Sequence, residues 1–478
     1  MTTFAQRAKA IRRKMAADPH RPVYHFLPPR NWMNDPNGLI HFAGRYHMFY
    51  QHNPQSAWWG TPSWGHAVSA DLLHWKDLPH ALHPDMPYDA GGAYTGCAVD
   101  NEGTPTIVYT GNGTGPPESH AQVQCLATGD GRMVRWRKHP RNPVIAAAPE
   151  GFSTRDFRDP YVWRRGRTWH MVVGTRDSVG RGAVLLYKSP DLIEWRFVGP
   201  LLRAAGRGQG TMWECPNFFP LGRRWVLIVS PVPLGRAIYF TGRFDGRRLA
   251  PERTGEIDAG GALYAPQTFA DASGRRILFG WLWERRSRRA AARAGWAGVM
   301  TLPRVLTMAR DGGLGFAPAA EIESIRRRKW QFAPAHVAQS GAMPLDELPG
   351  DCLEVRAAFE PGSAARFGLK VRCSPRGAER TLVGYDCRGG ALFVDTRRSS
   401  RSRAAITGVF RAPLKLARGE PLDLRVFLDR SVLEVFANGR ACLTGRIYPT
   451  LPASHRAAVF AEGGTAELRS LTAWQLRL

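Results

Sequence analysis

Residues 34–50 read Asn-Asp-Pro-Asn-Gly-Leu-Ile-His-Phe-Ala-Gly-Arg-Tyr-His-Met-Phe-Tyr, with one short apolar run before Gly44 and another after it. Two such runs around a glycine turn are typical of an antiparallel hairpin. The same order recurs around Gly103, Gly166, Gly222 and Gly274, and successive glycines of the five are 59, 63, 56 and 52 residues apart. A strand-built repeat of roughly 40–60 residues predicts the blades of a propeller.

A second motif recurs downstream of the hairpins. Residues 69–75 (Ser-Ala-Asp-Leu-Leu-His-Trp) and 189–195 (Ser-Pro-Asp-Leu-Ile-Glu-Trp) share the pattern Ser-x-Asp-Leu-x-x-Trp, and residues 128–136 hold a looser copy. A β-sandwich would also contain alternating strands, but it would not repeat one internal order five times. The sequence therefore predicts a five-bladed β-propeller over residues 21–318, behind an N-terminal extension at residues 1–20.

The pattern changes after the propeller. Ile322 and Ile325 lie three residues apart and a basic run follows them, which predicts a linker helix over residues 319–334. Farther on, apolar residues alternate with polar ones, as at Leu424, Val426 and Leu428. Period-two alternation with turn signals between the runs predicts a C-terminal β-sandwich over residues 335–478. The fold class is therefore predicted to be all-β.

Composition limits the class of partner. The chain has 478 residues, and its 66 basic residues against 40 acidic ones give a formal net charge of +26. A basic surface can attract nucleic acid, a membrane or an anionic substrate. Here only 8 of the 66 basic residues are Lys, and the arginines are scattered with no nucleic-acid motif beside their local runs. This pattern favours a bias of the coding sequence, so we expect no nucleic-acid partner.

Cellular location and redox state also follow from the sequence. No apolar run approaches the roughly 18 residues of a membrane span, so we expect no membrane partner. No apolar segment follows the charged N-terminal residues, so no secretory signal is predicted. The seven cysteines form no Cys-x-x-Cys pair and their number is odd, which fits reduced thiols. We expect a cytoplasmic protein, and the oligomeric state stays open.

Three acids stand where the repeat predicts the start of a first strand. Asp35, Asp159 and Glu214 precede the turn glycines of their units by 9, 7 and 8 residues. First strands of a propeller surround its axis, so the three carboxyl groups are expected to meet at one mouth, where like charges raise at least one pKa. Each acid alone could be a turn residue. A metal site is the rival interpretation, but it would need more His or oxygen ligands, and none is predicted.

Aromatic residues accompany the acids. The candidates for the edge of the pocket are Trp32, Trp58, Trp59, Trp64, Trp213 and Trp281. Aromatic faces stack against the C–H side of a sugar ring, while Asp, Asn, Gln and Arg bond its hydroxyls. Any one of these tryptophans could instead belong to the core, although loop-type neighbours favour Trp32 and Trp59 as ligand contacts. Paired carboxylates in such a pocket predict a sugar site.

These motifs resemble glycoside hydrolase family 32, which contains invertases, sucrose-6-phosphate hydrolases and fructan hydrolases. Residues 32–38 (Trp-Met-Asn-Asp-Pro-Asn-Gly) resemble its nucleophile signature, residues 157–160 (Phe-Arg-Asp-Pro) its second motif and residues 213–216 (Trp-Glu-Cys-Pro) its third. Further likenesses extend over residues 21–478, including residues 264–267 (Tyr-Ala-Pro-Gln) and 429–436 (Asp-Arg-Ser-Val-Leu-Glu-Val-Phe). The resemblance implies the same architecture that the repeat predicts.

The resemblance also implies roles for single residues. Asp35 would be the nucleophile and Glu214 the general acid/base, while Asp159 with Arg158 would hold fructosyl hydroxyls. The fructose subsite would be lined by Asn34, Gln51, Trp59, Tyr94 and Thr95, with Trp32 and Trp281 at the aromatic edge. The chain departs from the family in having Thr95 where Ser is usual, which keeps a hydroxyl. Ala262 replaces a common acid, which leaves the leaving-group specificity open.

Catalysis sets opposite demands on the two acids. Glu214 lies between Trp213 and Cys215-Pro216, so we expect few donors around it and a protonated carboxyl group near neutral pH. Asp35, next to Asn34 and Asn37, is expected to stay ionised. In the second domain Asp429 and Glu434 look isolated, and we expect them to be turn or ladder residues.

The predicted function is β-fructofuranosidase activity on sucrose and short fructans through a covalent fructosyl-enzyme, with no cofactor. The alternatives are sucrose-6-phosphate hydrolysis, fructosyl transfer and, in another class, fructan binding without turnover.

Overall fold

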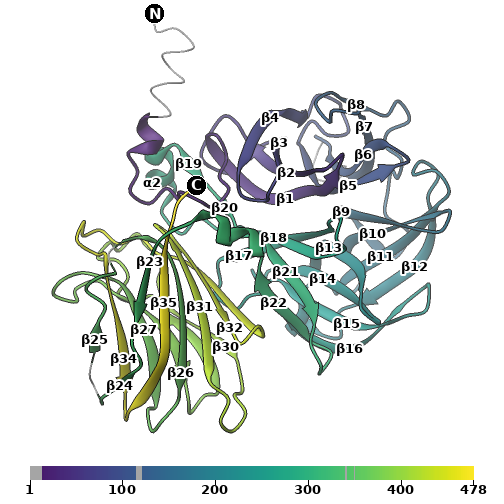
Figure 1. Cartoon of the computed structure of the whole chain (residues 1–478). Coiled ribbons are helices and arrows are strands. Elements are labelled where there is room, and N and C mark those ends of the chain that lie inside the picture. The colour runs from purple at the N-terminus through teal and green to yellow at the C-terminus, as the bar shows by residue number, and fades with distance from the viewer. Residues whose placement is uncertain (1–12, 115–120, 340–341, 349) are drawn as a thin grey trace, which may run out of the picture.

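The computed structural model describes residues 13–114, 121–339, 342–348 and 350–478. Within these residues, five sheets of four or five strands form the first domain and two larger sheets form the second. Figure 1 shows the two domains side by side, the first in purple to green and the second in green to yellow. The predicted all-β architecture, a five-bladed propeller followed by a sandwich, is confirmed. Residues 1–12 of the predicted N-terminal extension lie outside the described residues.

The five innermost strands form a closed ring around the propeller axis. They are β1 (Asn31–Phe42), β5 (Gly92–Asn101), β9 (Phe152–Arg165), β13 (Met212–Leu221) and β17 (Leu263–Ala270). Each contacts the next one, and β17 contacts β1. Each is also the first strand of one repeat unit, as the turn glycines predict.

The other strands follow outward in chain order and pair antiparallel with their neighbours. The second strands are β2 (Arg45–Asn53), β6 (Thr104–Asn112), β10 (Thr168–Asp177), β14 (Arg224–Val232) and β18 (Arg276–Leu282). The third strands are β3 (Ser63–Ser69), β7 (Gln122–Gly129), β11 (Gly182–Ser189), β15 (Ile238–Phe244) and β21 (Arg304–Met308). The outermost strands are β4 (Trp75–Leu82), β8 (Trp136–Lys138), β12 (Arg196–Arg203), β16 (Leu249–Glu256) and β22 (Leu314–Pro318). A short 3-10 helix, η1 (Arg207–Gln209), precedes the fourth blade.

The last blade also closes the ring. Between its second and third strands lie helix α2 (Arg288–Ala294) and the short strands β19 (Trp296–Ala297) and β20 (Val299–Met300). β19 pairs in parallel with β1 and so joins the end of the propeller to its beginning. Ser287 caps the N-terminus of α2, and Gly295 ends the helix with a φ of 80°.

The repeated Ser-x-Asp-Leu-x-x-Trp motif is a turn between the third and fourth strands of a blade. In the first blade Asp71 Oδ1 accepts the N–H groups of Leu73 and His74, and the indole of Trp75 donates to the Leu72 carbonyl at 2.9 Å. In the third blade the indole of Trp195 makes the equivalent bond at 2.8 Å. The motif therefore specifies a local turn, which is why it can be read from the sequence.

All five inner strands contain a β-bulge at equivalent positions. Their pairing with the second strand shifts register between Met33 and Pro36, Ala93 and Gly96, Arg158 and Tyr161, Glu214 and Asn217, and Tyr264 and Gln267. A β-bulge redirects the side chains beside it, and bulges are common next to active sites. The five bulges bring the residues between these points to one mouth of the axis.

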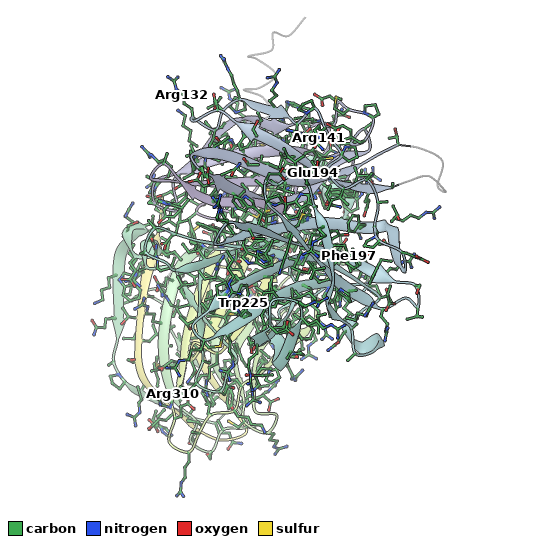
Figure 2. All side chains as sticks on the ribbon, turned by 90° about the vertical axis from the view of Figure 1, so that its right-hand side faces the viewer. Arg132, Arg141, Glu194, Phe197, Trp225 and Arg310 are labelled. Carbon is green, nitrogen blue, oxygen red and sulfur yellow. The ribbon has the colours of Figure 1, made fainter. Side chains whose placement is uncertain are left out.

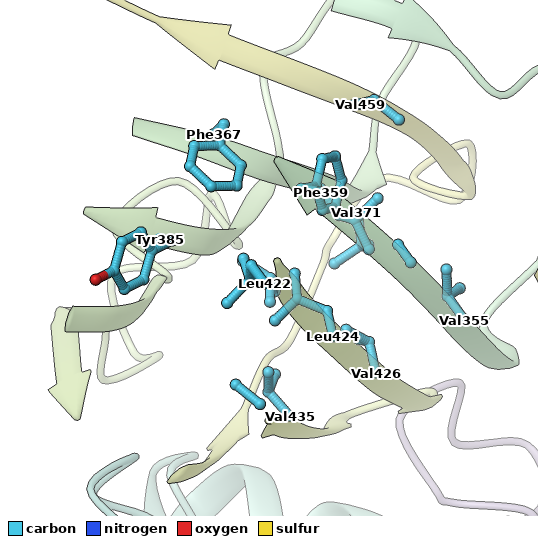
Figure 3. Packing of buried hydrophobic residues seen from close by; sticks show 14 of the residues in the cluster. Val355, Phe359, Phe367, Val371, Tyr385, Leu422, Leu424, Val426, Val435 and Val459 are labelled. Carbon is cyan, nitrogen blue, oxygen red and sulfur yellow. The ribbon is translucent and has the colours of Figure 1, made fainter. Parts of the chain in front are cut away.

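The second domain packs two sheets face to face. One contains β23 (Arg326–Phe332), β24 (Ala335–Val337), β26 (Cys352–Glu360), β31 (Leu422–Asp429), β32 (Val432–Ala437), β33 (Ala441–Arg446) and β35 (Ala466–Leu476). The other contains β25 (Ala342–Pro344), β27 (Arg366–Cys373), β28 (Thr381–Asp386), β29 (Ala391–Asp395), β30 (Val409–Pro413) and β34 (Arg456–Glu462). Figure 3 shows the core between them, where Phe359 and Val426 of one sheet face Phe367 and Val371 of the other.

The predicted linker helix over residues 319–334 is wrong for most of its length. A 3-10 helix, η2 (Ala320–Ile325), occupies the first part, and there Ile322 and Ile325 are fully buried. The basic run that follows is strand β23, which pairs antiparallel with β35 and buries Trp330. The edge of β35 supplies backbone partners that a local helical pattern cannot reveal, so the tertiary context overrides local propensity.

A buried ionic network joins the two domains. His25 Nδ1 lies 2.8 Å from Asp429 Oδ2, and its Nε2 lies 3.0 Å from Glu434 Oε1. Arg304 of the propeller contacts Glu434 at 2.6 Å and Asp258 at 2.9 Å. All five side chains are fully buried. Asp429 and Glu434 do lie in the ladder of β31 and β32, as expected. The expectation that they are isolated is wrong, because they meet partners more than 100 residues away in sequence.

Charged side chains elsewhere are spread over the surface. Figure 2 shows Arg132 and Arg310 projecting from different parts of the molecule. Arg141, which follows the second blade, pairs with Glu194 of the third blade, and both side chains are largely exposed. No helix in the described parts of the chain is both long and apolar enough to cross a membrane.

Candidate active site

A cavity of about 500 Å³ opens at the mouth where the five bulges meet. The predicted site residues that line it are Trp32, Asn34, Asp35, Gln51, Trp59, Tyr94, Arg158, Asp159, Glu214 and Trp281. Trp58, a candidate for the aromatic edge, also lines it. Thr95 does not line the cavity but lies directly behind Asp35. Trp64 and Trp213 do not line it either, because both are fully buried within their blades. The structure thus brings together residues from all five blades.

Asp35 belongs to a chain of hydrogen bonds that includes four other predicted residues. The Thr95 hydroxyl donates to Asp35 Oδ2 at 2.7 Å, and Asn34 Nδ2 donates to Asp35 Oδ1 at 3.1 Å. Gln51 accepts from Asn34 at 3.0 Å and donates to Thr95 at 2.5 Å. The indole of Trp32 donates to Asn34 Oδ1 at 2.8 Å. The carboxylate is therefore held in one orientation from both of its oxygens.

Asp159 has a backbone conformation that few residues other than glycine adopt, with a φ of 67°. The Thr110 hydroxyl accepts its backbone N–H at 2.8 Å. Its Oδ2 accepts the backbone N–H of Cys215 at 2.8 Å and lies 3.5 Å from the Cys215 thiol. The same thiol lies 3.6 Å from Asp35 Oδ2. The Cys215 side chain therefore separates the two aspartates.

Glu214 is surrounded by donors, contrary to the expectation from its sequence neighbours. Arg158 donates to Glu214 Oε1 from Nε at 3.0 Å and from Nη2 at 2.7 Å. Tyr264 donates to Oε2 at 2.6 Å. Arg158 also bonds Gln122 at 3.0 Å and Asp156 at 3.3 Å. These partners come from other blades, so the residues flanking Glu214 in sequence could not predict them.

The three acids do not occupy equivalent positions in their blades. Asp35 and Asp159 stand directly before a proline, and the matching positions of the other inner strands hold Thr95, Cys215 and Ala265. Glu214 stands one residue earlier, at the position of Asn34, Tyr94, Arg158 and Tyr264. The prediction that all three acids stand at one equivalent position of the repeat is therefore wrong. Two adjacent rings of side chains form the site, and Glu214 belongs to a different ring from the two aspartates.

Burial and mutual repulsion change the acidity of the aspartates. Burial is the main cause that raises the pKa of Asp35 to about 6; the charge of Glu214 adds to this, while bonds from Thr95 and Asn34 oppose it. Burial likewise raises the pKa of Asp159 to about 7, against the opposing charge of Arg158. Both aspartates are therefore weaker acids than a solvent-exposed aspartate.

Several residues of the site were not identified from the sequence as site residues. Tyr264 and Cys215 lie inside motifs that the sequence does show, and Cys215 directly follows the assigned Glu214. Gln122 and Asp156 carry no such signal and reach the cavity only because β7 and β9 are neighbours. Trp283 and Glu284 follow β18 and line the cavity. The alternation of Trp281 and Trp283 along that strand is the signal that could have identified them.

Among the residues that the structure describes, no group of three or more His, Cys, Asp or Glu side chains is placed to hold a metal ion. The three acids instead contact the guanidinium of Arg158, the phenol of Tyr264 and the thiol of Cys215. This is a set of groups that can move protons and bind hydroxyls.

Comparison with known proteins gives a consistent picture. The N-terminal-domain model of glycosyl hydrolases family 32 matches residues 25–318, and the family's C-terminal model matches residues 321–475. Sucrose-6-phosphate hydrolase of Escherichia coli is 37% identical, over 99% of this chain and 98% of that protein. Raffinose invertase of Escherichia coli is also 37% identical, over 95% of each chain.

A solved structure agrees along the whole length. The crystal structure of fructan 1-exohydrolase IIa from Cichorium intybus matches with a TM-score of 0.89 and 28% identity, covering 96% of this chain and 98% of that one. The protein is therefore a glycoside hydrolase, and the chain belongs to glycosyl hydrolase family 32.

Proposed function

We propose that the protein hydrolyses the β-fructofuranosyl bond of sucrose, and of short fructans, with retention of configuration. The observation that supports this most is that Asp35 and Glu214 face one cavity while their carboxyl groups have different partners. Asp35 is held by hydroxyl and amide donors, whereas Glu214 is held by a guanidinium and a phenol. Two acids in unlike environments suit a nucleophile and a proton donor.

The first step forms a covalent bond. Asp35 attacks the anomeric carbon of the fructosyl unit while Glu214 gives a proton to the departing oxygen, so glucose leaves as a neutral alcohol. Asp159 and Arg158 hold fructosyl hydroxyls and stabilise the positive charge of the transition state. Asn34, Gln51, Tyr94 and Trp59 complete the subsite, Trp32 and Trp281 form its aromatic edge, and Thr95 acts through Asp35.

The second step restores the enzyme. Glu214, now a carboxylate, takes a proton from water as the water oxygen attacks the same carbon and the bond to Asp35 breaks. Fructose is released in the β configuration. No cofactor enters either step. Tyr264 and Arg158 orient the Glu214 carboxyl group throughout the cycle.

Charge in the cavity favours a neutral substrate. Its lining contains the carboxyl groups of Asp35, Asp156, Asp159, Glu214 and Glu284 against the guanidinium groups of Arg155 and Arg158. A phosphate ester would add negative charge to a pocket that already has an excess of it, and this costs binding energy. Sucrose-6-phosphate hydrolysis is the second candidate. It is supported by the name of the Escherichia coli relative and by Arg155 at the cavity.

A substrate panel distinguishes these candidates. Purified protein is incubated with sucrose, sucrose 6-phosphate, raffinose, inulin and levan, and the released monosaccharides are quantified. We expect the highest kcat/KM on sucrose; a higher value on sucrose 6-phosphate would reverse the order of the two candidates. In aqueous methanol the fructosyl unit is transferred partly to methanol. Formation of methyl β-fructofuranoside supports retention, and the α anomer would exclude it.

A further inference from the structure

Residues 283–286 form the segment that leaves β18, and its first two residues, Trp283 and Glu284, line the cavity. Trp283 lines the cavity and is 37% exposed, so part of its ring is open to a ligand. Its ring stacks on Trp281, with centroids 4.7 Å apart and planes 28° apart. Its edge contacts Tyr264, at a centroid distance of 5.6 Å. Because Tyr264 bonds Glu214, Trp283 lies on the side of the cavity from which the leaving group departs.

The sandwich domain holds this segment in place. Tyr448, which follows β33, donates its hydroxyl hydrogen to Glu284 Oε1 at 2.5 Å and accepts the backbone N–H of Arg285 at 3.2 Å. The backbone N–H of Ile406, also in the sandwich, donates to the Arg285 carbonyl at 3.3 Å. The wall of the cavity is therefore attached to the second domain through both backbone and side chain.

Glu284 makes this attachment rigid. Its side chain is only 2% exposed, and Arg286 donates to its Oε2 at 3.0 Å. Burial alone would raise the pKa of Glu284, but Arg446, Arg286 and the Tyr448 hydroxyl together lower it below its usual value. A charged, fully bonded buried carboxylate fixes the groups around it. The exposed Trp283 ring next to it is thus presented in one orientation.

We propose that Trp283 is the surface on which the leaving-group sugar stacks, and that Tyr448 of the sandwich positions it through Glu284. The inference rests on the proposed function, because the role of Glu214 as proton donor defines the side of the cavity on which the leaving group lies. It gives the second domain a part in substrate choice without a part in the chemistry. Trp283 would touch the substrate, and Tyr448 and Glu284 are positioning residues.

The test compares two β-fructosides that share the fructosyl unit and differ in leaving group. Sucrose releases glucose, which can stack on Trp283, whereas methyl β-fructofuranoside releases methanol, which cannot. For Trp283→Ala we expect kcat/KM for sucrose to fall about tenfold, mainly through KM, and kcat/KM for the methyl glycoside to stay within about twofold. Trp283→Phe should recover most of the loss.

Tyr448→Phe tests the positioning role. We expect the ratio of kcat/KM for sucrose to that for the methyl glycoside to fall about threefold. The matched control is Tyr24→Phe, because the Tyr24 hydroxyl also makes a buried bond between the domains, to the Leu428 carbonyl at 2.7 Å, but does not line the cavity. Tyr24→Phe should lower Tm and leave the ratio unchanged.

Equal losses on both glycosides for Trp283→Ala, or no loss on either, would overturn the stacking role. A Tyr448→Phe ratio equal to that of Tyr24→Phe would overturn the positioning role. If the wild type cleaves another β-fructoside faster than sucrose, that substrate replaces sucrose in the ratio, so the test survives a different substrate preference. Absence of any β-fructoside cleavage by the wild type would instead contradict the proposed function.

Discussion

Asp35 is held by donors on both oxygens, and its environment raises its pKa to about 6. We expect Asp35→Asn to lower kcat at least a thousandfold, roughly 4 kcal/mol of transition-state stabilisation, because an amide fits the space but cannot form the covalent bond. The variant should remain folded, as circular dichroism would show. If the variant kept more than about a tenth of wild-type kcat, Asp35 could not be the nucleophile.

The same substitution has an effect on stability that depends on pH. A carboxyl group whose pKa is raised in the folded state destabilises that state when it ionises, so the cost is absent near pH 4 and complete above about pH 6. We therefore expect Asp35→Asn to raise Tm relative to wild type at pH 8 and to change it little at pH 4. For the same reason, wild-type kcat/KM should fall as pH drops below about 6.

Glu214 can be separated from Asp159 by varying the leaving group. Glucose needs a proton to depart, whereas p-nitrophenolate departs almost without help. Glu214→Gln should therefore cripple sucrose cleavage by several orders of magnitude and harm an activated β-fructoside much less, with partial rescue by azide. Asp159→Asn should lose activity on both substrates alike, without azide rescue. Equal losses for the Glu214 variant and no azide effect would require another acid.

The bulge in each inner strand directs side chains of that strand into the active site. At Gly96, an added Cβ would lie 2.1 Å from the Val108 carbonyl oxygen and 2.5 Å from Tyr109 Cα, both backbone atoms of β6. Gly96→Ala must therefore push β5 away from β6 and move Thr95 away from Asp35. We expect a loss of about 3 kcal/mol in unfolding free energy and a lower kcat.

Gly131 provides the control for that element. It lies in an exposed turn, and an added Cβ there would meet nothing within 4 Å. Gly131→Ala should leave both the denaturant midpoint and kcat close to wild type. If Gly96→Ala proved equally harmless, the close approach of β5 and β6 would not be what positions Thr95.

At the scale of the whole molecule, His25 is the centre of the contact between propeller and sandwich. Burial alone would lower the pKa of His25, but bonds to Asp429 and Glu434 raise it above 6.5. Arg304, which bonds Glu434, and Tyr24 and Cys352 face the same cluster. A raised histidine pKa stabilises the fold fully below about pH 6.5, and this stabilisation is lost as pH rises through the folded-state pKa.

Replacing His25 should therefore change both stability and its pH dependence. We expect His25→Gln to lower the unfolding free energy by about 3 kcal/mol at pH 6, because the buried carboxylates of Asp429 and Glu434 both lose the imidazolium, and by less at pH 9. Guanidinium unfolding at the two pH values measures this. An equal loss at both would mean that the imidazolium charge does not contribute. Turnover of the folded fraction should stay near wild type, since the cluster lies outside the cavity.

Much of this protein is determined by its sequence, because the decisive signals are local. A hairpin needs only its two apolar runs and its glycine turn, so five hairpins reveal five blades. The Ser-x-Asp-Leu-x-x-Trp turn closes on itself within seven residues. Asp35, Asp159 and Glu214 precede the turn glycines of their hairpins by 9, 7 and 8 residues, so their meeting at one mouth follows from the repeat and the closure of a propeller.

Other features depend on contacts that no local pattern contains. Arg158 and Tyr264 reach Glu214 from 56 and 50 residues away, and His25 meets Asp429 across 404 residues. The bulges shift the strand register, so Glu214 falls in a different ring from the aspartates. The basic run after Ile325 is a strand only because the edge of β35 pairs with it. The sequence alone determined the blades and their acids, whereas tertiary structure decided the partners and acidity of those acids, because burial and charge depend on residues that only folding brings together.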